Sequence, residues 1–76
     1  MSTNIARLEV LHNRLSDIIE EATKVTPASV GALLLLSEIL EVWREIYSLD
    51  PTLDNRMNVD FAEHMFLRAF PSVAQA

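Results

Sequence analysis

Apolar residues near the start of the chain recur at the spacing of one helix face. The spacings alternate between three and four residues, in the series Leu8, Leu11, Leu15, Ile18, Ala22 and Val25. Such a series forms one stripe along an amphipathic helix. No proline or glycine interrupts the segment. The pattern predicts a first helix over residues 4–25.

Capping and helix-breaking residues mark out a second segment. Thr26 stands directly before Pro27, a pair that is typical of a helix N-cap followed by the first helical position. A second helix is therefore predicted over residues 27–49, and Asp50 and Pro51 are expected to end it. Because so few residues separate the two helices, we expect them to fold back as an antiparallel hairpin.

The remainder of the chain is predicted to be a loop followed by a short helix. Residues 50–60, DPTLDNRMNVD, are rich in turn formers and leave room for one short helical turn. A third helix is predicted over residues 59–69, where Pro71 ends it. Residues 71–76 are expected to form a tail.

The expected hairpin also fixes which residues of the first two helices lie opposite one another. With the turn at residue 26, Arg14 is placed near Glu38, and Arg7 near Glu45. We therefore predict two ion pairs between the helices, each contributing about 0–1 kcal/mol.

The second helix has more apolar surface than one neighbouring helix can cover. Its apolar side chains span an arc of about 200°, where a surface helix usually shows little more than 100°. Its start, VGALLLL at residues 30–36, is apolar nearly all round. The 76-residue chain also lacks cysteine, so no disulfide stabilises its small core. We therefore expect a homodimer, with a contact surface formed by Leu11, Leu15, Ile18, Val30, Gly31 and Leu34. The predicted fold class is all-α: an antiparallel helical hairpin plus a short third helix, in a dimeric helix bundle.

Charge and composition exclude several classes of partner. The net charge of −5, with only six basic residues, provides no basic surface for nucleic acid. Glu38, Glu41 and Glu45 interrupt the longest apolar segment, so we expect no membrane span, and no basic face suits a membrane surface. The N-terminus lacks the apolar stretch of a signal peptide, and cysteine is absent, so a cytoplasmic location is predicted.

Two pairs of acidic residues raise the alternative of a metal-dependent enzyme. Glu20 and Glu21 precede Glu38 and Glu41, and the arrangement is similar to the motif of the all-α nucleoside triphosphate pyrophosphohydrolases. The resemblance implies magnesium bound by these carboxylates and nucleotide hydrolysis. That family has a further glutamate where this chain has Lys24, and an aspartate where Glu41 stands. The expected register also leaves Glu38 about 9 Å beyond the point opposite Glu21. We therefore predict no metal, no cofactor and no catalytic site.

Aromatic residues and methionine indicate a surface for a protein partner, although the same residues suit a helical core. These residue types are favoured at binding hot spots, and the candidates are Trp43, Tyr47, Met65, Phe66 and Phe70. The sequence thus favours a non-enzymatic regulator, adaptor or inhibitor that binds an unidentified larger protein as a small helical homodimer. Small helical accessory proteins of bacteria and phages are similar in size and character. A magnesium-dependent nucleotide pyrophosphohydrolase and a structural assembly subunit are the alternatives.

Overall fold

The protein is built from three α-helices. The computed structural model describes residues 2–27 and 29–71, and within these ranges it contains no strand. The helices are α1 (Ser2–Ala22), α2 (Val30–Leu49) and α3 (Leu53–Ala69). The all-α fold class predicted from the sequence is therefore confirmed.

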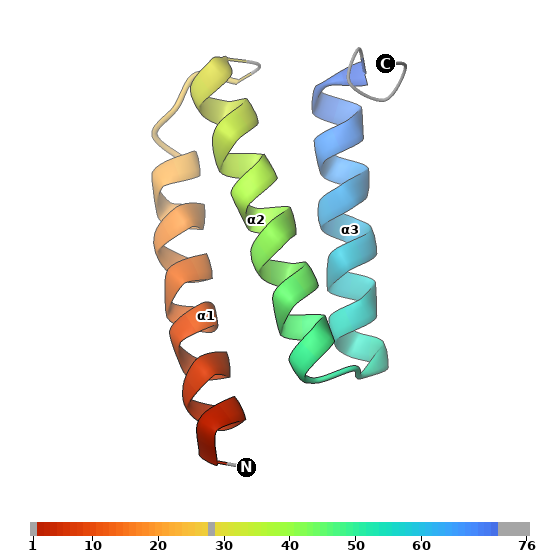
Figure 1. The fold of residues 1–76 in the computed structure, drawn as a ribbon. Coiled ribbons are helices and arrows are strands. Elements are labelled where there is room, and N and C mark those ends of the chain that lie inside the picture. The colour runs from red at the N-terminus through yellow and green to blue at the C-terminus, as the bar shows by residue number, and fades with distance from the viewer. Residues whose placement is uncertain (1, 28, 72–76) are drawn as a thin grey trace.

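The helices lie side by side, with α2 between the other two (Figure 1). Successive helices run in opposite directions, so that α1 and α3 point the same way. Both outer helices pack against α2, whereas no close backbone contact joins α1 to α3 in the described part of the chain. The molecule measures 40 × 25 × 17 Å. This arrangement leaves α1 and α3 as separate walls on either side of α2.

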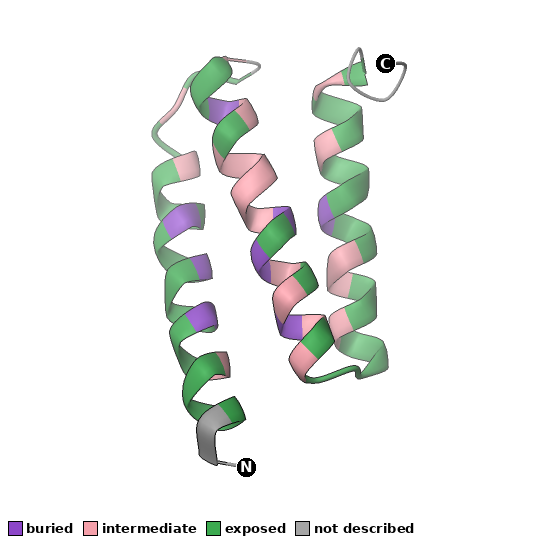
Figure 2. Ribbon diagram, in the orientation of Figure 1, coloured by how far each residue is buried: buried purple, intermediate pink, exposed green. Residues whose placement is uncertain are grey.

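The main core lies between α1 and α2. Its buried members are large aliphatic side chains, namely Leu11, Leu15, Ile18, Val42 and Ile46. On the ribbon they occupy the facing sides of the two helices (Figure 2). On α3, by contrast, the small residue Ala62 is the buried member among the described residues. The third helix thus shields little of its own apolar surface.

The connection between α1 and α2 is longer than the sequence predicted. The first helix ends at Ala22 instead of residue 25, and the second begins at Val30 instead of residue 27. Ser29 is the N-cap, and its hydroxyl accepts a hydrogen bond of 3.1 Å from the backbone N–H of Ala32. That bond satisfies one of the free N–H groups at the helix start. The expectation that Thr26 and Pro27 begin the helix was therefore wrong.

The third helix begins earlier than predicted and is not short. It starts at Leu53 instead of residue 59 and contains 17 residues. Thr52 is its N-cap, with its hydroxyl accepting a 3.2 Å hydrogen bond from the N–H of Asn55. The Asn55 side chain in turn donates to the backbone carbonyl of Asp50 at 2.8 Å. Residues interpreted as turn formers therefore cap a helix, because Thr, Asp and Asn favour both roles.

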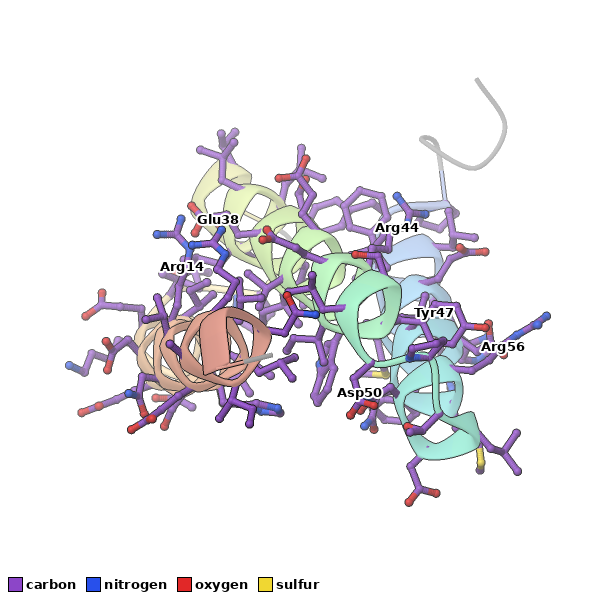
Figure 3. All side chains as sticks on the ribbon, turned by 60° about the horizontal axis from the view of Figure 1, so that its bottom comes forward. Arg14, Glu38, Arg44, Tyr47, Asp50 and Arg56 are labelled. Carbon is purple, nitrogen blue, oxygen red and sulfur yellow. The ribbon has the colours of Figure 1, made fainter. Side chains whose placement is uncertain are left out.

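The two ion pairs predicted between α1 and α2 are both present. Arg7 contacts Glu45 at 2.7 Å, and Arg14 contacts Glu38 at 3.1 Å. Arg14 and Glu38 reach toward each other across the two helices (Figure 3). All four side chains are about half exposed, so the pairs contribute little to stability.

Candidate functional site

An apolar groove crosses the three helices on one face of the molecule. Its volume is about 310 Å³. The floor comes from α2, one wall from α1 and the other wall from α3, and the lining residues are Ile19, Leu36, Ile39, Trp43, Phe61, Ala62 and Met65. The groove exists because α1 and α3 do not close against each other over α2. No charged side chain is among the residues that line it.

Aromatic rings give the groove its largest apolar side chains. Trp43 is half-buried, and the His12 ring meets it edge-to-face with ring centroids 6.0 Å apart. Aromatic contacts of this geometry hold a ring in place and contribute about 0.5–1.5 kcal/mol. Phe61, on the wall formed by α3, is 65 % exposed. The groove thus combines an indole held by its neighbours with an accessible phenyl ring.

A row of exposed apolar residues along α3 continues one wall of the groove. Its members are spaced four residues apart and all are exposed, namely Leu53, Met57, Phe61 and Met65. Residues at this spacing are neighbours on a helix surface. Contiguous exposed apolar side chains of this kind are typical of protein interaction sites.

The structure brings together only part of the partner-binding set predicted from the sequence. Trp43 and Met65 both line the groove. Phe66 and Phe70 are half-buried and pack on each other, with ring centroids 5.9 Å apart. Tyr47 is half-buried on α2 and does not line the groove. The five residues thus do not all line one groove, and their role in partner binding stays a prediction.

Phe61 was not predicted as a binding residue from the sequence, although it is the most exposed of the groove residues. The signal was its position four residues before Met65, which places both on one side of a helix. Because the predicted loop extended to residue 60, the continuation of this row to Leu53 and Met57 was not predicted. A helix capped by Thr52 and beginning at Leu53 contains all four residues at a spacing of four.

The six residues predicted to form a dimer contact separate into two groups. Leu11, Leu15 and Ile18 are buried within the chain by α2, so a second copy is not needed to cover them. This part of the expected contact surface is corrected, because α1 directs its main apolar stripe at α2. The exposed group consists of Val30, Gly31 and Leu34.

Gly31 carries no special packing requirement within the chain. A Cβ atom at this position would lie 3.7 Å from Ser29 Oγ and from Val25 Cγ1. Both distances are ordinary van der Waals contacts, so alanine fits without a shift of the backbone. Val30 and Leu34 are the large apolar residues of the exposed group, and they lie one turn apart on α2.

The glutamates of the pyrophosphohydrolase-like pattern do not converge. Glu21 lies 3.8 Å from Lys24 on its own helix, whereas Glu38 is paired with Arg14. In the part of the chain that the structure describes, no three acidic, histidine or cysteine side chains are placed to hold a metal ion.

A second cavity, of about 320 Å³, lies between α1 and α2. Charged side chains dominate its lining, which consists of Arg7, Val10, Leu11, Arg14, Glu38, Glu41, Val42 and Glu45. The two interhelical ion pairs lie in this lining. It is therefore a polar surface cleft, in contrast to the apolar groove.

Comparisons with protein families, with curated proteins and with solved structures found no match. Over residues 2–27 and 29–71, no helix is both long enough and apolar enough to cross a bilayer.

Proposed function

We propose that this chain is a non-enzymatic protein-binding module, acting as a regulator, adaptor or inhibitor of a larger protein. The observation that carries the proposal is the apolar groove, with Trp43 on its floor and Phe61 and Met65 on one wall. Ligand sites of proteins are concave and largely apolar. Aromatic residues and methionine are also the types enriched in protein interfaces.

The exposed surface of the chain supports a protein-sized partner. The chain exposes 5496 Å², whereas a folded monomer of this mass exposes about 4,700 Å². The chain thus exposes about 800 Å² more than such a monomer, summed over its whole surface, which is similar to the area that one partner contributes to a standard interface.

We also propose a homodimer through Val30 and Leu34. Both side chains are exposed on α2, and neither lines the groove. A contact at this patch would leave the groove of each copy open. The absence of cysteine supports a cytoplasmic location for the dimer.

Capture from a lysate of the source cells, with the full chain as bait, tests the binding function. Phe61→Gln removes an exposed apolar ring from the groove, and Leu67→Gln is the matched control because it lies on the same helix outside the groove. Proteins that bind through the groove are retained by the wild type and by Leu67→Gln but lost by Phe61→Gln. If all three baits retain the same proteins, the groove is not the binding surface.

Sedimentation velocity over a range of concentrations tests the dimer. Leu34→Glu places a charge in the proposed contact and is expected to convert the dimer to a monomer. A monomeric wild type would refute the dimer, and a dimeric Leu34→Glu variant would assign the contact to another surface.

A further inference from the structure

The groove lies between α1 and α3 and over α2, where a four-helix bundle would place its fourth helix. Ile19 on α1 faces Phe61 and Met65 on α3 across the floor formed by α2. Helices pack at about 8–10 Å between axes, and a bundle places such a neighbour against two or more others. A fourth helix laid between the walls would cover the exposed apolar residues of both.

The helical walls also select the secondary structure of the occupant. Residues 2–22, 30–49 and 53–69 satisfy most backbone groups within their own helices, so the groove offers side chains and no strand edge. An extended peptide would place its N–H and C=O groups against apolar side chains without partners, which costs free energy. A helix satisfies its own backbone groups and presents only side chains.

The distribution of ion pairs leaves the surface with an excess of negative charge. Four of the six basic side chains are paired with glutamates of the chain itself, in Arg7–Glu45, Arg14–Glu38, Lys24–Glu21 and Arg44–Glu63. The other basic residues are Arg56 and Arg68. Within the described ranges, seven carboxylates form no ion pair, namely Glu9, Asp17, Glu20, Glu41, Asp50, Asp54 and Asp60.

Two of these carboxylates are close in sequence to wall residues of the groove, one on each wall helix. Glu20 follows Ile19 of the α1 wall, and Asp54 lies two turns before Phe61 on the same side of α3. Arg68, one turn after the lining residue Met65, adds one positive charge at the other end of that wall. Among the described residues, the two helices that border the groove thus carry five unpaired carboxylates and two unpaired basic residues, whereas the groove lining is uncharged.

We infer that the groove binds an amphipathic helix of a protein partner, with one apolar stripe flanked by lysine or arginine. The inference rests on the proposed function of the groove and adds the chemistry of its partner. The apolar stripe would pack on Trp43, Phe61 and Met65. Long basic side chains can extend their apolar stems along the walls and carry their charge to Glu20 and Asp54 at the borders. The net charge of −5 favours a basic partner at the groove, whereas the second copy of the chain is assigned to the separate patch of Val30 and Leu34.

The only tryptophan of the chain provides a direct signal for the test, because Trp43 lines the groove. Three synthetic helical peptides of about 18 residues, or about 27 Å, carry the same leucine stripe and no tryptophan. Their flanking positions hold lysine, glutamine or glutamate. Each peptide is titrated into the full chain, and Trp43 emission is recorded. The lysine peptide is expected to shift the emission to shorter wavelength and to bind about tenfold more tightly than the glutamine peptide, which corresponds to two or three surface ion pairs.

Variants of the full chain distinguish groove binding from attraction to a negative protein. Phe61→Gln keeps the net charge and, because Phe61 is 65 % exposed, is expected to keep the fold, which circular dichroism verifies. It should lose binding of the lysine peptide, whereas Leu67→Gln should retain it. Equal binding of the lysine peptide by Phe61→Gln would overturn the inference.

The remaining outcomes separate this inference from the proposed function. Equal affinity for the lysine and glutamate peptides overturns the basic partner and leaves the groove as a helix-binding site. If no peptide binds and the chain self-associates in a manner that Phe61→Gln abolishes, a second copy fills the groove and the inference is wrong. If no peptide binds and no association depends on Phe61, both the inference and the groove as a binding site are refuted.

Discussion

Replacing Ile46 with a smaller residue provides the sharpest test of how α1 packs on α2. The Ile46 side chain is completely buried, with 0 % exposure. It belongs to the aliphatic core that Leu11, Leu15 and Ile18 of α1 form with α2. Any smaller residue at position 46 therefore leaves a cavity in the core between these two helices.

The expected loss of stability can be graded by the size of the replacement. Ile46→Val removes one methylene, and we expect the free energy of unfolding to fall by about 0.5–1.5 kcal/mol. Ile46→Ala removes two more carbons and is expected to cost about 2–5 kcal/mol. A domain of this length has a total stability of about 4–11 kcal/mol. The valine variant should thus stay folded, whereas the alanine variant should lose a large part of the total.

Urea denaturation followed by far-UV circular dichroism measures both changes by linear extrapolation. Trp43 fluorescence is a second probe, and coincident transitions establish two-state unfolding. Ile5→Ala is the control, because Ile5 is 69 % exposed and its truncation should change stability by no more than about 0.5 kcal/mol. If Ile46→Ala costs no more than this control, the packing of α1 on α2 is not the one described.

Three smaller perturbations test the helix starts and the register. Ser29→Ala and Thr52→Ala should each lower stability by about 1 kcal/mol, since each removes an N-cap hydroxyl. Thr26→Ala should change stability by less than about 0.5 kcal/mol. If Thr26→Ala lowers the free energy of unfolding more than Ser29→Ala in the same urea assay, α2 begins at Pro27 and not at Val30. A double-mutant cycle of Arg14→Ala and Glu38→Ala should give a coupling of about 0.2–1 kcal/mol that disappears near 1 M salt. Coupling that survives high salt would show that the pair is not the exposed contact described.

The helical class and the register of the first two helices followed from local pattern. Apolar residues three and four apart identify a buried helix face with no knowledge of the neighbour. Once two such helices are joined by a short connection, their rise per residue sets which side chains meet. For this reason the Arg7–Glu45 and Arg14–Glu38 contacts were predictable, and both are present.

The helix starts were less predictable, because the same residue types serve in turns and in caps. Thr26 and Ser29 are both suitable N-caps, and so are Asp50, Thr52 and Asn58 for the third helix. Local preference does not distinguish them. In the structure the N-caps are Ser29 and Thr52, whose hydroxyls accept hydrogen bonds from the backbone N–H groups of Ala32 and Asn55, respectively.

The sequence by itself determined that the chain is helical, that α1 has one buried stripe and that α2 has more apolar surface than one neighbour can cover. Only the tertiary structure decided how this surface is divided between α1, α3 and solvent. The physical reason is that the spacing of apolar residues shows how much of a helix surface is apolar. Which helix buries that surface depends on how the other helices are placed. Leu11 and Leu15 are covered within the chain because α1 packs on α2. The helices α1 and α3 stand apart on either side of α2, which leaves a groove between them. Trp43, Phe61 and Met65 instead line an open groove.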